Sequence, residues 1–94
     1  MRDAAGAGRP EAAAAEEEAA LVAAAKVDGA AFAALYRRHR GPIYRYLRAR
    51  TRCDEDAADL TQQVFLKAFE ALPRYQERGL PFAAWLFRLA RNAA

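Results

Sequence analysis

The sequence predicts an all-α fold, a compact bundle of about four to five helices. Alanine, the strongest helix former, supplies 26 of the 94 residues. Five glycines and four prolines are too few for a turn-dense β-sandwich. Larger apolar residues recur at helical spacing in several segments, and no segment shows the strict alternation of a half-buried strand.

The first half of the chain predicts a tail followed by three helices. Residues 1–10 are small and polar, so we expect a disordered N-terminal tail ahead of a helical domain over residues 11–94. Alanine and glutamate over residues 11–27 favour a helix that docks by a narrow apolar stripe. Asp28 has the character of an N-cap for the next helix, whose inner face is Phe32, Leu35, Tyr36 and His39. The Gly41-Pro42 pair is expected to end that helix and to begin a third, with Pro42 in its first turn.

The second half predicts two more helices around a short loop. Asp54 is the candidate N-cap of a helix that has further acids in its first turn and ends at Leu72, before Pro73. Residues 74–80 form a polar loop, and Pro81 opens a final helix that runs to the end of the chain. Short connections between helices indicate a compact bundle.

Charge is arranged in blocks along the chain. Residues 29–53 contain seven arginines and no acid, whereas residues 54–72 carry a net charge of −4 and residues 73–94 a net charge of +3. Arginine suits bidentate contacts to phosphate and carboxylate groups and stacks on aromatic rings and bases. A GC-rich coding sequence explains the number of arginines better than it explains their grouping.

The composition excludes several kinds of site. A single cysteine, Cys53, excludes an internal disulfide framework and a cysteine-based zinc site. The only histidine, His39, lies on a mainly apolar helix face, and no catalytic constellation or glycine-rich phosphate loop is present. We therefore expect no enzyme activity, no metal and no cofactor. No apolar run has the length of a membrane span or a signal-peptide core, which predicts a cytoplasmic protein without membrane insertion.

One face of the helix over residues 55–72 is not explained by a core. On a helical wheel the inward residues are Ala57, Thr61, Val64, Phe65, Ala68 and Leu72. The opposite side carries one apolar residue among polar ones: Asp59, Gln62, Gln63, Leu66 and Glu70. The wheel alone favours a solvated face with one exposed leucine, which is common. The alternative is a protein-docking face with Leu66 as its apolar anchor.

The final helix and the loop before it show a second such face. Phe82, Leu86, Leu89 and Ala93 point inward, Arg88 and Arg91 point outward, and Trp85 and Asn92 lie at the border. The loop adds Arg74, Tyr75 and Arg78. Arginines bind phosphates, aromatic rings stack on bases and amides read base edges, so these residues suit single-stranded nucleic acid. In the alternative interpretation Trp85 belongs to the core and the arginines only confer solubility.

Two strings, in this order and spacing, resemble the second conserved region of bacterial sigma factors, most closely the extracytoplasmic-function (ECF) group. They are DLTQQVFLKAFEALPRY (59–75) and PFAAWLFRLARNAA (81–94). The upstream stretch FAALYRRHRGPIYRYLRAR (32–50) is similar to the opening helices of the same family. The resemblance covers about residues 20–94.

The resemblance implies an all-helical domain that binds RNA polymerase and opens promoters. By this correspondence Asp59 and Gln62, with Gln63 and Leu66 beside them, contact the clamp helices of the polymerase's largest subunit. The loop over residues 74–80 and the last helix would capture the minus-ten element as single-stranded DNA of the non-template strand. In the loop these are Arg74, Tyr75 and Arg78, and on the helix Trp85, Arg88, Arg91 and Asn92. An anti-sigma factor is a further implied partner.

The chain departs from the family pattern in two respects. Many relatives have glutamate after the D-L-T-Q element, whereas this chain has Gln63, which removes one carboxylate from the docking face. The family's fourth conserved region, which reads the minus-thirty-five element, is absent, so we expect weak promoter binding by this chain alone. Two other functions stay open: a helical protein-interaction module without promoter activity, and a helix-turn-helix domain that binds duplex DNA.

Overall fold

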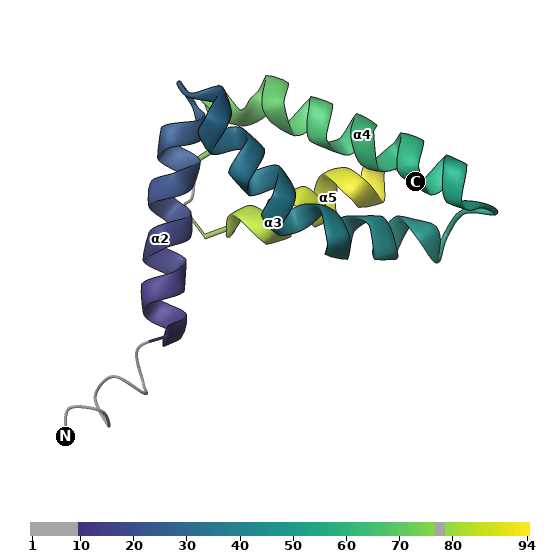
Figure 1. Ribbon diagram of the computed structural model, residues 1–94, viewed down its shortest axis with the longest axis horizontal. Coiled ribbons are helices and arrows are strands. Elements are labelled where there is room, and N and C mark those ends of the chain that lie inside the picture. Colours follow the sequence, from purple (N-terminus) through teal and green to yellow (C-terminus); the bar gives the residue numbers. More distant parts are fainter. Residues whose placement is uncertain (1–9, 77–78) are drawn as a thin grey trace.

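The computed structural model describes residues 10–76 and 79–94. In those residues the chain forms four α-helices, one short 3₁₀ helix and no strand, which confirms the predicted all-α fold (Figure 1). The elements in chain order are α2 (Pro10–Ala25), α3 (Gly29–Arg48), α4 (Asp54–Ala71), η1 (Leu72–Arg74) and α5 (Phe82–Ala93). Of the predicted N-terminal tail, only Pro10 lies within the described residues, and it is the first residue of α2.

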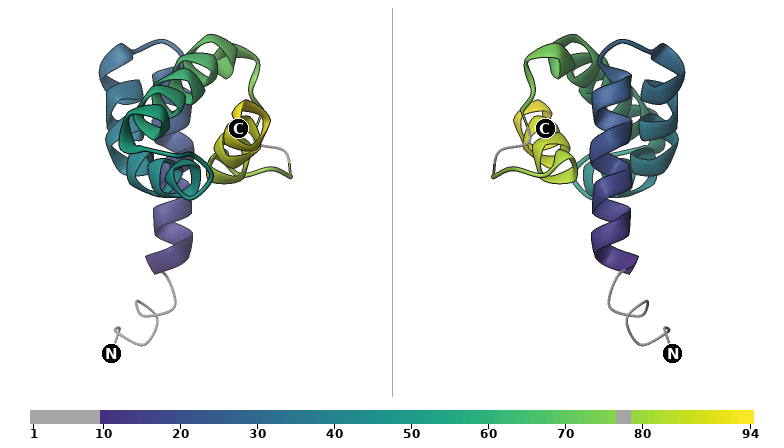
Figure 2. Two further views of the ribbon diagram at one scale, coloured as in Figure 1. Left: turned by 90° about the vertical axis from the view of Figure 1, so that its right-hand side faces the viewer. Right: turned by 90° about the vertical axis from the view of Figure 1, so that its left-hand side faces the viewer.

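Three helices enclose the core and the fourth closes one end. α3 and α4 run antiparallel, and α5 packs against both of them on one side (Figures 1 and 2). α2 packs against α3 at one end of the α3–α4 pair and runs across it (Figure 1). The largest fully buried side chains come from α3, α4, η1 and α5: Leu35, Ile43, Leu47, Val64, Leu72, Phe82 and Leu86.

The helix periodicity of the sequence agrees with the observed burial. In α2 the buried residues are Val22 and Ala25, with Leu21 partly buried beside them, which is the narrow stripe expected of this alanine-rich helix. All six residues predicted to face inward over residues 55–72 are buried: five lie in α4, and the sixth, Leu72, lies in η1. The predicted N-cap of α3 is also confirmed, because the Asp28 side chain accepts a hydrogen bond of 2.9 Å from the backbone N–H of Ala30.

The prediction that Gly41-Pro42 separates two helices is wrong. α3 continues through Pro42 to Arg48, so the expected second and third helices are one element. A proline inside a helix removes one backbone hydrogen bond and costs about 3 kcal/mol. Leu35 before it and Ile43 and Leu47 after it are almost completely buried on the same helix, and burial of three such side chains exceeds that cost.

The start of α4 also differs from the prediction. The N-cap is Cys53, without a side-chain cap, and Asp54 is the first helical residue. Asp54 is instead held by α3: its Oδ1 atom accepts hydrogen bonds from Arg48 Nε (2.7 Å) and Tyr44 Oη (3.3 Å). At its other end α4 stops at Ala71, and Leu72, Pro73 and Arg74 form η1. Proline is compatible with the first positions of such a turn, where no donor is required.

Candidate docking and nucleic-acid surfaces

We use the name docking surface for the four candidate residues on the outer side of α4: Asp59, Gln62, Gln63 and Leu66. All four side chains are exposed, and together they line one open hollow. Leu66 keeps 57% of its surface exposed, although large apolar side chains are otherwise mostly buried in this protein. Residues three and four positions apart lie on the same side of a helix, so these four residues lie on the side of α4 opposite its core face.

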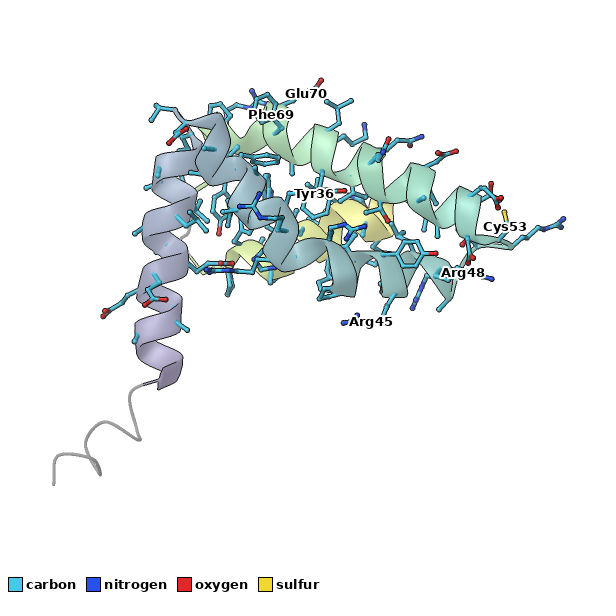
Figure 3. The ribbon with its side chains drawn as sticks, in the orientation of Figure 1. Tyr36, Arg45, Arg48, Cys53, Phe69 and Glu70 are labelled. Carbon is cyan, nitrogen blue, oxygen red and sulfur yellow. The ribbon has the colours of Figure 1, made fainter. Side chains whose placement is uncertain are left out.

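Residues of α3 border the docking surface, which the helical wheel of a single helix cannot predict. Gln62 also lines a smaller groove whose other walls include Tyr36, Arg40 and Tyr44. Tyr36 lies between the two helices (Figure 3), and its ring meets the Phe65 ring edge-on with 5.0 Å between the ring centres. The Arg40 guanidinium lies 5.7 Å from the centre of the Tyr36 ring, in cation–π range.

Phe69 is a second exposed apolar residue on α4. It lies three residues after Leu66, is 52% exposed, and meets the Phe32 ring edge-on at 5.1 Å. Figure 3 shows Phe69 and Glu70 at the C-terminal end of α4. A helical wheel puts Phe69 at the border of the core face, so periodicity alone does not distinguish a core residue from a surface one here.

The nucleic-acid surface predicted from the sequence is only partly exposed in the structure. Arg74 is exposed at the end of η1, and Arg88, Arg91 and Asn92 are exposed on α5. Trp85 is partly buried, at the edge of the core. Tyr75 is buried, with 6% of its surface exposed. Arg78 lies outside the described residues.

Tyr75 belongs to an aromatic cluster that we define as Tyr75, Phe82 and Trp85. The Tyr75 and Trp85 rings lie 4.7 Å apart between centres with 36° between their planes, and each ring also contacts Phe82, at 5.9 Å and 5.6 Å respectively. The Tyr75 hydroxyl donates a hydrogen bond of 2.7 Å to the carbonyl of Leu80. Tyr75 therefore links its own end of the loop to Leu80 at the other end. In this conformation the buried Tyr75 ring is not available for stacking on a base.

Gly79, near the C-terminal end of the loop, has a backbone conformation that favours glycine. Gly79 has a φ of 72°, in the left-handed region that other residues rarely adopt. Two residues later, Pro81 is the N-cap of α5. The loop base is thus fixed both by backbone geometry and by the aromatic cluster.

The arginines of α3 and of the turn after it are divided between ion pairs, ring contacts and solvent. Arg48 pairs with Asp54 at 2.7 Å, and the Arg48 hydrogen bond lowers the pKa of the Asp54 carboxyl. Arg50 lies 3.8 Å above the Tyr46 ring, which contacts Phe87 of α5 edge-on at 5.5 Å. Arg45 is exposed on the outer side of α3 (Figure 3).

Two further properties bear on what the described residues can do. No group of three or more histidine, cysteine, aspartate or glutamate side chains in residues 10–76 and 79–94 could hold a metal ion. Over the same ranges, no helix is both long and apolar enough to cross a membrane.

Comparisons with known proteins agree with the resemblance read from the motifs. The family model described as sigma-70 region 2 matches residues 35–94. The chain is 37% identical over 62 residues to the ECF RNA polymerase sigma factor BldN of Streptomyces coelicolor, covering 66% of this chain and 24% of that protein. It is 43% identical over 54 residues to the ECF RNA polymerase sigma factor SigD of Mycobacterium tuberculosis, covering 53% of this chain and 26% of that protein.

The chain spans about a quarter of the length of these curated relatives. No solved structure matches it. The matched family region contains most of α3, all of α4 and all of α5, and therefore both candidate surfaces, whereas α2 precedes it.

Proposed function

The chain belongs to the sigma-70 region 2 family, and we propose that it serves transcription initiation by docking on RNA polymerase and capturing single-stranded promoter DNA. ECF sigma factors are among its relatives. In this proposal the domain acts in the cytoplasm by binding and catalyses no reaction. It needs neither a metal nor an organic cofactor.

The docking surface carries the first half of the proposal. Asp59, Gln62, Gln63 and Leu66 gather around one hollow on α4, and an exposed leucine ringed by polar groups is the composition of a small protein interface. We assign this surface to the clamp helices of the polymerase's largest subunit. The amides of Gln62 and Gln63 supply donors and acceptors around the apolar anchor.

The exposed polar residues of α5 carry the second half. Arg88, Arg91 and Asn92 share a helix with Trp85, and Arg74 is exposed at the other end of the loop. We assign them to the non-template strand of the minus-ten element, with arginines on phosphates and the Asn92 amide on a base edge. Tyr75 contributes by holding the two ends of the loop together, because its ring is buried in the core.

An anti-sigma factor that covers either surface would keep the domain inactive in the cell, and we include such a partner in the proposal. The competing function is a helical protein-interaction module without promoter activity. The exposed Phe69 beside the docking surface is compatible with that alternative, since an apolar extension fits many protein partners.

Paired substitutions on the two surfaces test the proposal. Asp59→Ala with Leu66→Glu alters only exposed positions of α4, and Arg91→Ala with Asn92→Ala alters only exposed positions of α5. The first pair should weaken binding to a clamp-helix fragment of bacterial RNA polymerase by about 30-fold or more, as expected for loss of an interface anchor. It should leave binding to a single-stranded minus-ten oligonucleotide unchanged.

The second pair should do the reverse. Loss of Arg91 removes a phosphate contact and weakens all sequences, whereas loss of Asn92 weakens the preferred sequence most. Glu17→Ala, an exposed acid on α2, is the matched control and should change neither binding reaction. If the polymerase fragment binds normally to the first pair, the docking assignment is wrong; if neither DNA nor polymerase binds the unsubstituted chain, the interaction module is the better description.

A further inference from the structure

The region before the family match makes two polar contacts that lead to the aromatic cluster. The match begins at residue 35, so α2 and the turn after it lie outside it. Val22 and Ala25 are buried against the core and fix the C-terminal part of α2. Glu18 lies on α2, and Lys26 lies in the turn that follows it.

Lys26 contacts the loop base directly. Its Nζ atom donates a hydrogen bond of 2.7 Å to the backbone carbonyl of Tyr75, across 49 residues of sequence and in a partly buried setting. The Tyr75 hydroxyl in turn donates to the Leu80 carbonyl. One lysine outside the matched region therefore holds the residue that joins both ends of the loop.

Glu18 reaches the same cluster through α3. Its carboxylate accepts a hydrogen bond of 2.7 Å from Arg38 Nη1 and one of 2.5 Å from His39 Nε2. The Glu18 and His39 side chains are only 17% and 15% exposed, so this pair is less solvated than an ordinary surface ion pair. The His39 ring meets Phe82 edge-on at 5.4 Å, and Phe82 is the first residue of α5.

The two contacts thus meet the aromatic cluster from two sides. Lys26 holds Tyr75 by its carbonyl, and Glu18 orients His39 against Phe82. Tyr75 and Phe82 both pack on Trp85, which precedes Arg88 by one helical turn on α5. A displacement at either contact would change how Trp85 and the polar residues after it are presented to solvent.

Resting on the proposed function, we infer that α2 and the turn after it form a positioning element for strand capture, with Glu18 and Lys26 as its positioning residues. Neither residue contacts DNA in this mechanism. They hold Tyr75 and Phe82 in place before the DNA strand binds, which reduces the conformational entropy that would otherwise be lost on binding. Loss of the contact made by Lys26 therefore weakens strand binding through Tyr75, not through lost phosphate attraction.

Trp85 gives a readout that does not depend on DNA. It is the only tryptophan in the chain, and it lies directly against Tyr75 and Phe82. Lys26→Met keeps the length of the side chain and removes the ammonium donor. We expect higher acrylamide quenching of Trp85 fluorescence in this variant, with unchanged helical circular dichroism, and restoration of the original quenching by Lys26→Arg, which retains a cationic donor.

Strand binding is the second readout, with Lys67→Met as the matched control. Lys67 is the only other lysine and is exposed on α4, so its loss removes the same charge without touching the loop base. Lys26→Met should weaken binding of a single-stranded minus-ten oligonucleotide by about tenfold, the lower end of the value of one hydrogen bond from a charged donor. Lys67→Met should change neither quenching nor affinity, and Glu18→Gln should act in the same direction as Lys26→Met.

The possible outcomes separate this inference from the proposed function. Unchanged quenching and affinity in Lys26→Met would overturn the inference and leave the proposed function intact. Equal loss of affinity in Lys26→Met and Lys67→Met would also overturn it, because charge alone would then explain the effect. If quenching rises in Lys26→Met but the unsubstituted chain binds no single-stranded DNA, the contact positions Trp85 and the proposed function has failed.

Discussion

Asp54 illustrates how one carboxylate fixes the turn between α3 and α4. It accepts hydrogen bonds from Arg48 and Tyr44, and the Arg48 hydrogen bond is the main reason that the pKa of Asp54 lies below its ordinary value of 3.8. A carboxyl with a lowered folded-state pKa stabilises the fold above its unfolded-state pKa. That contribution is lost as the pH falls through the folded-state pKa.

This sign gives a prediction for the pH dependence of stability. Asp54→Asn should lower the melting temperature slightly near neutral pH, since both partners are exposed and solvent weakens the ion pair. The difference between the variant and the unsubstituted protein should shrink as the pH falls from about 5 to about 2. Thermal circular dichroism over this range measures it.

A double-mutant cycle with Arg48→Ala provides the control at this position. The coupling between Asp54→Asn and Arg48→Ala should be measurable near neutral pH and should disappear at low pH, where the carboxyl is protonated. Coupling that stays constant over the whole pH range would show that Asp54 acts through the shape of its side chain and not through its charge.

At the level of the element, α3 carries a proline in its interior. Pro42 is exposed and sits in an otherwise continuous helix of 20 residues. Pro42→Ala restores a backbone donor and removes a steric conflict with the preceding turn. We expect the free energy of unfolding to rise by about 1–3 kcal/mol, less than the full helix-propensity difference because proline also restricts the unfolded chain.

Gly41→Ala is the companion substitution. A Cβ at position 41 would meet only the flexible end of the Arg45 side chain, at 3.4 Å. The gain should be about 0.5–1 kcal/mol, from reduced freedom of the unfolded chain. Urea denaturation measures both variants. Destabilisation by Pro42→Ala would mean that a bend at this proline is needed to pack Leu35 and Leu47 into one core.

The helices α3 and α4 show what the sequence can and cannot predict. α4 has five inward residues at regular helical spacing, which Leu72 of η1 continues, and its core face and its exposed face were both predicted correctly. The Gly41-Pro42 pair misled the prediction of α3, because a local helix-breaking signal gives no measure of the tertiary burial that opposes it. Cys53 replaced Asp54 as the N-cap of α4 because Asp54 found its partners on α3.

For the whole molecule, the positions of aromatic and charged groups depend on contacts between distant segments. Buried Tyr75 contacts Phe82 and Trp85 on α5 and Lys26 after α2, two segments distant from each other in sequence, and no periodicity in the loop sequence signals its burial. The contact between Glu18 and His39 likewise joins α2 to α3. The sequence therefore indicated which residue types could bind DNA, but not that one of them lies beneath the surface.

The distribution of charge over the molecule also predicts how strand binding responds to salt. α5 contains two arginines and no acid, and exposed Arg74 lies at the end of η1. The three acids in the first turn of α4 lie on a different element. Under the proposed function, strand binding should release counterions, and the log–log slope of affinity against salt should be about −0.7 for each phosphate contacted.

Arg91→Ala should make that slope less negative by about 0.7, because it removes one phosphate contact from a single strand. Arg37→Ala removes an exposed arginine from α3, outside the nucleic-acid surface, and should leave the slope unchanged. Fluorescence anisotropy of a labelled minus-ten oligonucleotide at several salt concentrations measures both slopes. If phosphates follow a defined path along α5, the position of an arginine must matter as well as its charge. Equal changes of slope in the two variants would therefore indicate that net charge alone attracts the DNA.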